Sequence, residues 1–433
     1  MTEQLLAIAR NTFVQSIRQP IYFVLLGIGI LALILNLSLS AFTMDDDNRF
    51  LLDMGMATIF LDGLFIAAFV ATSVLSREIH DKTVLTVVSK PVGRPLFIFG
   101  KYLGVSGAIL VAATILACAF MLTKRHQVLQ TASDVLDWPV IIFGLTAAFL
   151  SLGVAVWGNY FYGWVFTSSA VTMMLPTSII AWLGVLAFSK EWKYQLLSAE
   201  HGGMISPDLD MALIIALFAL FMALLVMSAV AIAASTRLGQ VLTVLVCLLV
   251  FLMGLLSDHM FGRRAFEAEP LARIIEIEPG RDLDDNFADE GDWYIIRVDQ
   301  ALELSEGMMV DVASDPLGMS SIMRDLPGER ADHAQIRNLN QTSLELVRID
   351  DGRPLRVPRL DDYFLSGPPT VHPLWRVLWS IPPNLQFLIL IDPLTQGHYI
   401  PFFYILEITI YSVLYIIAVL ALAVMLFQTR EVG

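Results

Sequence analysis

The 433-residue chain has the composition of a membrane protein. Apolar and aromatic residues make up 56% of it, only 16% are charged, and the mean hydropathy is +0.68, whereas soluble domains carry roughly a quarter charged residues. The net charge is −14, and most of it lies in residues 257–380, where it argues against nucleic acid and anionic lipid as ligands of that region, because both carry negative charge. We therefore expect a polytopic membrane protein. Its two cysteines, Cys118 and Cys247, lie in apolar runs and indicate no disulfide framework.

Residues 1–19 precede the first apolar run. Six of their side chains recur at helical spacing and form one apolar face: Leu5, Ile8, Ala9, Thr12, Phe13 and Ile17. The pattern predicts a helix that is either separate from the first membrane span or a simple extension of it.

Eight apolar stretches are long enough to cross a bilayer, because a hydrocarbon layer of about 30 Å needs roughly 20 apolar residues per helix. They are residues 20–42, 54–75, 102–122, 139–158, 163–188, 209–234, 240–256 and 400–427. The first seven make up a transmembrane domain at 20–256, and 400–433 holds the last span and a short tail. Because only residues 159–163 interrupt the fourth and fifth stretches, these two are either full spans or a re-entrant hairpin.

The Lys and Arg residues near the spans predict the orientation, because short cytoplasmic loops are enriched in them. With eight spans, most of these residues share one side: Arg10, Arg18, Arg77, Lys82, Lys90, Arg94, Lys101, Arg237 and Arg430. We expect this side to be the cytoplasm and to hold both termini. Four residues fall on the outer side and disagree with this assignment: Lys124, Arg125, Lys190 and Lys193.

Residues 257–380 differ abruptly from the rest of the chain. They contain 24 acidic residues, 13 Arg and no Lys, which accounts for −11 of the net charge. Residues 293–298 and 344–349 alternate apolar and polar side chains, which is typical of short strands between Gly and Pro turns. We expect a small β-rich extracytoplasmic domain, with a solvated linker as the alternative, followed by an interfacial segment at 381–399.

Two acidic residues, Asp62 and Glu407, fall inside predicted spans, away from the first and last two residues of those spans. An acidic group at membrane depth is costly unless it is paired or hydrated, so both are candidate functional sites. The structural alternatives are an interhelical hydrogen bond or, for Glu407 near its helix end, a protonated acid close to the lipid headgroups.

Sequence motifs for catalysis are absent. The chain has no H-E-x-x-H, no G-x-S-x-G and no cysteine cluster with metal-binding spacing. Residues 93–101 come closest to a phosphate-binding loop, but the glycines are too far apart and Tyr102 stands where the Mg²⁺-binding Ser or Thr belongs. We expect a chain that is not itself an enzyme and that holds neither metal nor cofactor.

The connection at 76–101 combines charges of both signs with apolar residues. Residues 76–83 are polar, residues 84–88 are apolar, and residues 90–94 form a stiff basic turn with Pro and Gly. Such a segment either docks on another protein or lies as a loop in the membrane interface.

Ten residues in this connection form a recognisable pattern: Glu78, Thr83, Leu85, Ser89, Lys90, Pro91, Val92, Arg94, Gly100 and Lys101. They resemble the segment after the second helix in membrane subunits of ABC-two-type transporters, the exporter-like permeases. Weaker matches follow in family order at 8–10, 18–20, 235–240, 383–386 and 429–432. The chain departs from the family in having Lys82 where glycine is usual, eight spans where six are usual, and an inserted acidic domain.

The resemblance implies a permease subunit with a six-helix core and an extra helix pair, which moves an unidentified substrate across or out of the plasma membrane of a bacterium or archaeon. A separate ATPase subunit would bind ATP and Mg²⁺, and two permease chains, identical or related, would pair in the membrane. Residues 1–19 would form an interfacial elbow helix. The ATPase would dock on Arg77, Glu78, His80, Asp81, Lys82, Thr83, Lys90, Pro91, Val92, Arg94 and Lys101.

Two other classes of protein stay open. A membrane-anchored assembly factor or receptor would use its outer domain as the working part, although eight spans are more than anchoring needs. An ion-coupled secondary transporter would use Asp62 and Glu407 as coupling groups and would need no ATPase.

Overall fold

The structure is a computed structural model, and it describes residues 2–40, 47–80, 93–128, 136–194, 210–267, 270–279, 287–288, 293–302, 304–313, 332–340, 342–348, 355–356, 364–367, 370–391, 394 and 403–428. The chain forms two compact units. Met1–Leu249 together with Phe402–Gly433 make up the helical unit, and Val250–Pro401 make up the barrel unit.

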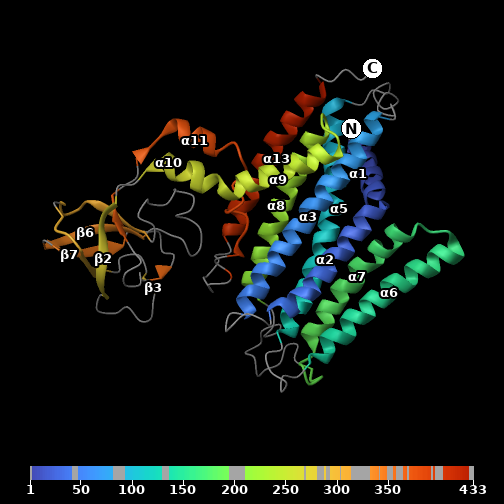
Figure 1. The fold of residues 1–433 in the computed structure, drawn as a ribbon, viewed down its shortest axis with the longest axis horizontal. Coiled ribbons are helices and arrows are strands. Elements are labelled where there is room, and N and C mark those ends of the chain that lie inside the picture. The colour runs from blue at the N-terminus through green and yellow to red at the C-terminus, as the bar shows by residue number, and fades with distance from the viewer. Residues whose placement is uncertain are drawn as a thin grey trace. The chain divides into compact units, whose positions relative to one another are not determined.

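Nine helices of at least 16 residues follow one another in the described part of the chain (Figure 1). They are α1 (Thr2–Ile17), α2 (Pro20–Ser40), α3 (Asp47–His80), α5 (Arg94–His126), α6 (Trp138–Tyr162), α7 (Phe166–Ala187), α8 (Met211–Ser235), α9 (Gln240–Ser257) and α13 (Tyr404–Gln428). All except α1 are long and apolar enough to cross a bilayer. The prediction of a polytopic membrane protein with eight candidate spans is confirmed.

The fourth and fifth apolar stretches form two separate helices. The first of them, α6, ends at Tyr162. Gly163 follows α6 in the left-handed conformation (φ 65°), which glycine adopts without strain. Only Trp164 and Val165 separate it from α7, so α6 and α7 form an antiparallel hairpin (Figure 1). Because the two helices have 25 and 22 residues, each is long enough for a full span.

Helices α3, α5 and α8 form the core of the helical unit, because most residues of their apolar stretches are buried, whereas a third or fewer are buried in α2, α6, α7, α9 and α13. Polar side chains between helices hydrogen-bond one another or the backbone. Tyr22 OH donates to the Ala108 carbonyl at 2.7 Å, and Ser73 Oγ donates to Gln19 Oε1 at 2.6 Å. Such bonds replace water inside a membrane-spanning bundle.

The predicted apolar face of the N-terminal segment packs on α5. The chain leaves helical geometry at residues 18–19, so α1 is a separate helix rather than an extension of α2. Ile8 lies over Gly100, and Ala9 and Thr12 lie over Gly104. A Cβ atom at Gly104 would be 2.5 Å from the Ala9 carbonyl oxygen, so the two backbones approach as closely as in helix pairs joined through small residues.

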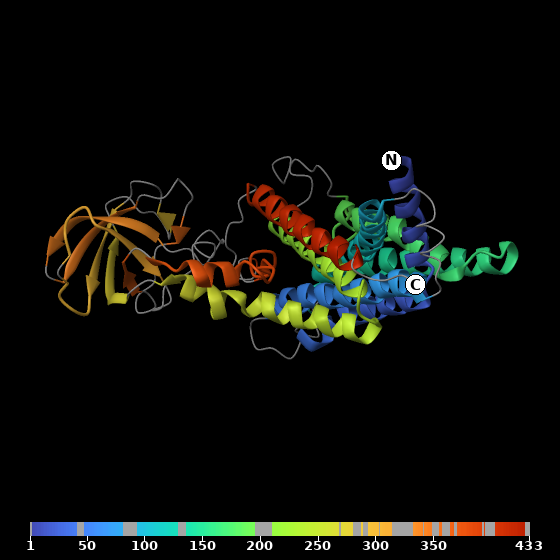
Figure 2. The same ribbon diagram turned by 90° about the horizontal axis from the view of Figure 1, so that it is seen from above.

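The barrel unit contains a closed antiparallel barrel with strand order β2-β4-β7-β6-β5-β9 (Figure 2). Its strands are β2 (Pro270–Pro279), β4 (Trp293–Val298), β5 (Met309–Ala313), β6 (Asp332–Asn340), β7 (Ser343–Arg348) and β9 (Phe364–Ser366). Strands β5, β6 and β7 form a meander and β4 returns beside β7, which is a Greek-key arrangement. Two short pairs accompany the barrel, β1 (Phe266–Glu267) with β10 (Thr370–Val371) and β3 (Phe287–Ala288) with β8 (Leu355–Arg356).

Alternation along the strands builds the core of the barrel. Tyr294, Ile296 and Val298 of β4 are buried together with Ile336 and Leu346 from neighbouring strands, because successive side chains of a strand point to opposite faces. The prediction of a β-rich region is confirmed, and the two predicted strands correspond to β4 and β7.

The barrel unit begins at Val250, within α9, rather than at residue 257. The helix continues into a π-helical turn, η2 (Asp258–Gly262), and α10 (Arg263–Ala265). Helix α11 (Pro373–Trp379) packs on these turns, with 6.4 Å between the ring centroids of Phe261 and Trp375. The unit ends at Pro401 and therefore takes in the predicted interfacial segment at 381–399.

Candidate functional site

The predicted docking connection begins and ends at one end of the helical unit, called here the terminal end because α1 begins and α13 ends there (Figure 1). Arg77, Glu78 and His80 lie in the last turn of α3, and Arg94 is the first residue of α5. The other predicted docking residues before Lys101 lie outside the described residues: Asp81, Lys82, Thr83, Lys90, Pro91 and Val92.

Two arginines of the terminal end bind the last turn of α13. Arg94 Nη1 donates to the Gln428 carbonyl at 2.9 Å, and Arg237, in the connection from α8 to α9, donates from Nε to the Leu426 carbonyl at 2.9 Å. The last carbonyls of a helix lack partners within the helix and carry partial negative charge, so guanidinium groups stabilise them. Arg94 therefore joins the start of α5 to the end of α13.

Lys101 is buried within the helical unit. The residue is 2% exposed, and its ammonium group lies 5.4 Å from the centroid of the Phe97 ring, within the range of a cation–π contact. In this chain by itself, Lys101 supports the packing of α5 and does not present its charge to a docking partner.

Asp62 lies in the middle of α3 and is 7% exposed. Its Oδ2 atom faces α2 so closely that a Cβ atom added at Gly29 would lie 2.5 Å from it. Among the described residues, no donor hydrogen-bonds this oxygen. A buried carboxylate without a donor is costly, so Asp62 is a candidate for binding a proton or a cation.

Glu407 occupies a different kind of position. It lies in the first turn of α13, where the helix dipole favours an acidic side chain. In the part of the chain that the structure describes, no hydrogen bond or ion pair joins it to Asp62.

The four basic residues that disagree with the predicted orientation lie at the opposite end of the helical unit: Lys124, Arg125, Lys190 and Lys193. Here α5 and α7 end while α6 and α8 begin. Lys124 Nζ lies 2.5 Å from Asp210 Oδ2, and Arg125 Nε lies 3.3 Å from Asp137 Oδ2. The two carboxylates also cap helices, since Asp137 accepts a hydrogen bond from the Val140 N–H and Asp210 accepts one from the Leu213 N–H. Each ion pair therefore joins the end of α5 to the first turn of another helix.

Arg125 also binds the end of α7. Its Nη1 donates to the Val185 carbonyl at 3.1 Å and its Nη2 donates to the Phe188 carbonyl at 2.8 Å. The Arg125 side chain is only 10% exposed, and the Asp137 side chain is fully buried. One guanidinium group thus joins the ends of three helices.

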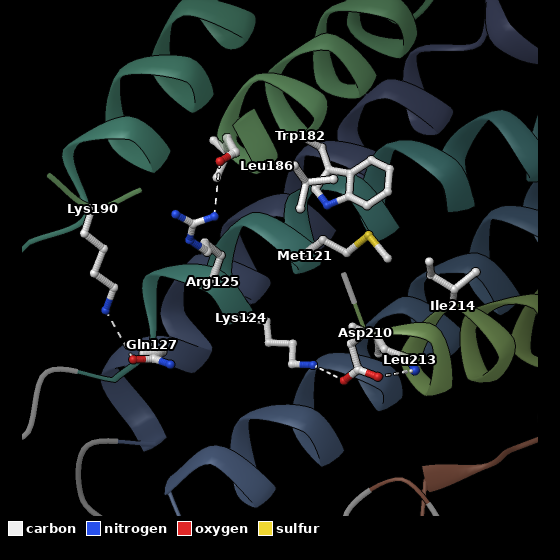
Figure 3. A pocket seen from close by; sticks show the side chains of 11 residues that line it. Met121, Lys124, Arg125, Gln127, Trp182, Leu186, Lys190, Asp210, Leu213 and Ile214 are labelled. Carbon is white, nitrogen blue, oxygen red and sulfur yellow. Dashed lines mark hydrogen bonds and ion pairs between the residues drawn. The ribbon is translucent and has the colours of Figure 1, made fainter. Parts of the chain in front are cut away.

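A cavity of about 380 Å³ lies between α5, α7 and α8 at this end, called here the cavity end (Figure 3). Its polar wall consists of Lys124, Arg125, Gln127, Lys190 and Asp210, and its apolar wall of Met121, Trp182, Val185, Leu186, Leu213 and Ile214. Figure 3 shows Lys190 directed toward Gln127, whose Oε1 accepts a hydrogen bond from its ammonium group at 3.2 Å. Among the described residues, the wall carries three cationic side chains and one carboxylate, an excess of positive charge.

The electrostatics of the cavity end keep Asp210 ionised. Partial burial by itself raises the pKa of Asp210, but hydrogen bonds from the Lys124 ammonium group and the Leu213 N–H outweigh it and hold the pKa below its usual range. The ion pair therefore persists through neutral and mildly acidic pH.

Sequence reasoning missed this cavity because it treated Lys124, Arg125 and Lys190 only as loop charges. A signal was present, since Asp137 and Asp210 stand directly before apolar runs, the position of an N-cap. The pairing of these caps with basic residues distant in the sequence could not be read from spacing.

Comparisons of the chain with protein-family models, curated proteins and solved structures found no match. In the described residues, no group of His, Cys, Asp and Glu side chains has an arrangement that could hold a metal ion. The candidate sites are therefore the terminal end, Asp62 and the cavity end, argued from the chain's own residues.

Proposed function

We propose that this chain is the membrane subunit of an ATP-binding cassette transporter and that the connection between α3 and α5 docks on a separate ATPase subunit. The observation that carries the proposal is the residue pattern from Glu78 to Lys101, which resembles the exporter-like permeases. ATP and Mg²⁺ would bind to the partner, and this chain would provide the path for the substrate.

The terminal end offers a physical route for coupling. Residues 81–92 connect α3 and α5, two helices of the core, and Arg94 hydrogen-bonds the end of α13 at 2.9 Å. A docked subunit that displaces this connection acts on the ends of three helices at once. Rigid movement of helices around a substrate path is a common way in which transporters use such a displacement.

The charge distribution supports an orientation with the terminal end in the cytoplasm and the barrel unit outside. Nine Lys and Arg residues near the spans favour it, whereas Lys124, Arg125, Lys190 and Lys193 lie on the outer side. Asp210 and Asp137 pair with Lys124 and Arg125 there. By the same resemblance we propose a pair of permease chains in the plasma membrane of a bacterium or archaeon.

Affinity purification from native membranes tests the proposal. Lys90→Glu reverses a charge in the connection, and Lys193→Glu is its matched control, because Lys193 is an exposed lysine at the other end of the helical unit with a side chain 78% exposed. We expect an ATPase subunit to co-purify with wild type and with Lys193→Glu and to be lost from Lys90→Glu. Arg94→Glu is less suitable, because it also disturbs the end of α13.

Absence of an ATPase from the wild-type sample, even after cross-linking in intact membranes, would contradict the proposal. Retention of the ATPase by Lys90→Glu and by a second reversal, Lys82→Glu, would place docking elsewhere on the chain.

A second candidate function is ion-coupled transport, which the buried Oδ2 of Asp62 favours. Purified protein in liposomes that contain a pH-sensitive dye would then take up protons under an imposed gradient. Asp62→Asn should abolish this uptake. If wild type moves no protons, or if Asp62→Leu leaves both activity and folding unchanged, Asp62 serves only the packing of α3 against α2.

A further inference from the structure

The cavity between α5, α7 and α8 has no role in the proposed docking of an ATPase. We propose that it binds a phosphate-bearing anion, either the headgroup of an anionic phospholipid or a soluble phosphate compound. This inference does not depend on the proposed function, because it rests only on the residues that line the cavity.

Lys190 supplies the uncompensated charge. The charge of Lys124 is offset by Asp210 and that of Arg125 by Asp137. Lys190 donates to Gln127 Oε1, a neutral acceptor, and no carboxylate of the described residues pairs with it. The cavity therefore attracts an anion at Lys190.

The lysines of the polar wall have more N–H donors than their hydrogen bonds to other residues of the wall occupy. An ammonium group has three N–H donors, and Lys124 directs one to Asp210 while Lys190 directs one to Gln127 (Figure 3). A phosphate group has several strong acceptor oxygens. It can accept hydrogen bonds from these lysines without breaking the pair of Lys124 with Asp210.

The size and apolar wall of the cavity fit a ligand with a hydrocarbon part. Its volume of about 380 Å³ lies in the range of small-molecule sites, roughly 300–1,000 Å³. Met121, Trp182 and Ile214 line it beside the lysines, and tryptophan is enriched where membrane proteins meet the headgroup layer.

Titration of the full-length protein in mild detergent tests this inference with three probes: phosphatidylglycerol, phosphatidylcholine and glycerol 3-phosphate. The readouts are the shift in thermal unfolding and the number of lipids retained in native mass spectrometry. The decisive variant is Lys190→Gln, and Lys193→Gln is the matched control, because Lys193 is a nearby exposed lysine that does not line the cavity.

We expect phosphatidylglycerol to stabilise the wild type more than phosphatidylcholine does. Lys190→Gln should weaken phosphatidylglycerol binding about five- to tenfold, the size of one charge-assisted contact, and Lys193→Gln should leave it unchanged. Stabilisation by phosphatidylglycerol alone identifies a lipid headgroup as the ligand. Equal protection by glycerol 3-phosphate, with the same dependence on Lys190, identifies a soluble phosphate compound.

A second variant keeps the test decisive if Lys190→Gln fails to fold. Gln127→Glu places a carboxylate beside Lys190 and cancels its charge while keeping the contact between the two side chains, so it should also lose anion binding. The proposal is overturned if neither phosphatidylglycerol nor glycerol 3-phosphate binds above the level of phosphatidylcholine. It is also overturned if the variants at residues 190 and 193 weaken binding equally, because general surface charge would then explain it.

Discussion

The two ends of the helical unit both use arginine to bind the last carbonyls of a helix, but they differ in burial. At the terminal end, the bonds of Arg94 and Arg237 to α13 are exposed. At the cavity end, Arg125 is nearly buried, binds two carbonyls of α7 and pairs with the fully buried Asp137. The same side-chain chemistry thus gives a weak junction at one end and a strong one at the other.

This difference fits two mechanical roles. Exposed charged contacts typically contribute about 0–1 kcal/mol, so the terminal end can exchange them when a partner docks. Removing one member of a buried pair costs about 3–5 kcal/mol, so the cavity end resists rearrangement. The contacts at the terminal end should therefore break more readily than those at the cavity end.

The largest effect is expected from breaking the buried pair. Arg125→Ala leaves Asp137 buried without its cationic partner and also removes two bonds to α7. The free energy of unfolding, measured in mixed micelles, should fall by about 3–5 kcal/mol.

Arg125→Leu combined with Asp137→Asn provides the control for this prediction. Asparagine keeps an N-cap acceptor for the Val140 N–H, and no charge is left unpaired. The double variant should therefore be more stable than Arg125→Ala. If Arg125→Ala alone matches wild type, the cavity end is not held by this pair and the contrast between the ends fails.

An intermediate effect is expected where α1 meets α5. Gly104→Ala places a Cβ atom 2.5 Å from the Ala9 carbonyl oxygen, so the helices must separate at a cost of about 1–3 kcal/mol. Gly27→Ala is the control, because a Cβ atom there has no neighbour within 4 Å. Thermal unfolding should show a lower transition temperature for Gly104→Ala only, and equal behaviour of the two variants would mean that the approach of α1 to α5 is not tight.

Much of the fold could be predicted from the sequence, because long apolar runs and strand alternation are local patterns. The eight candidate spans and the strands predicted at 293–298 and 344–349 are of this kind, whereas the second compact unit runs from Val250 to Pro401 and is wider than the predicted 257–380. The apolar face of residues 5–17 also identified which side of α1 is covered. The pattern could not identify α5 as the partner, because Gly100 and Gly104 are distant in the sequence.

The candidate sites were harder to predict, because they depend on pairs of residues from different helices. Lys101 fitted a family pattern, yet it is buried beside Phe97. Lys124 and Arg125 were interpreted only as loop charges, yet each pairs with a carboxylate from a distant part of the sequence, Asp210 and Asp137. Charge in a sequence shows where a cation lies along the chain, and only packing shows whether another residue neutralises it.

A smaller effect is expected from Arg94→Ala, which removes one exposed bond to the end of α13. The loss should be about 0.3–1 kcal/mol, the range for a cation at a helix C-terminus, and Arg94→Lys should recover part of it. Urea-induced unfolding in detergent measures both variants. A loss as large as that of Arg125→Ala would show that the terminal end is held as strongly as the cavity end.

The smallest effect is expected from Asp210 and depends on pH. Because Lys124 and the Leu213 N–H lower its pKa in the folded chain, Asp210 adds stability above the unfolded value of about 3.9 and loses it as the pH falls through the folded value. Its side chain is 37% exposed, so screening limits the contribution to about 1 kcal/mol or less. Asp210→Asn should lower the unfolding temperature slightly at pH 7, and the difference from wild type should be smaller at pH 3, because the contribution declines below the unfolded value. Because asparagine still caps the Leu213 N–H, an equal loss at both pH values would mean that the packing of residue 210, rather than its charge, holds α8 against α5.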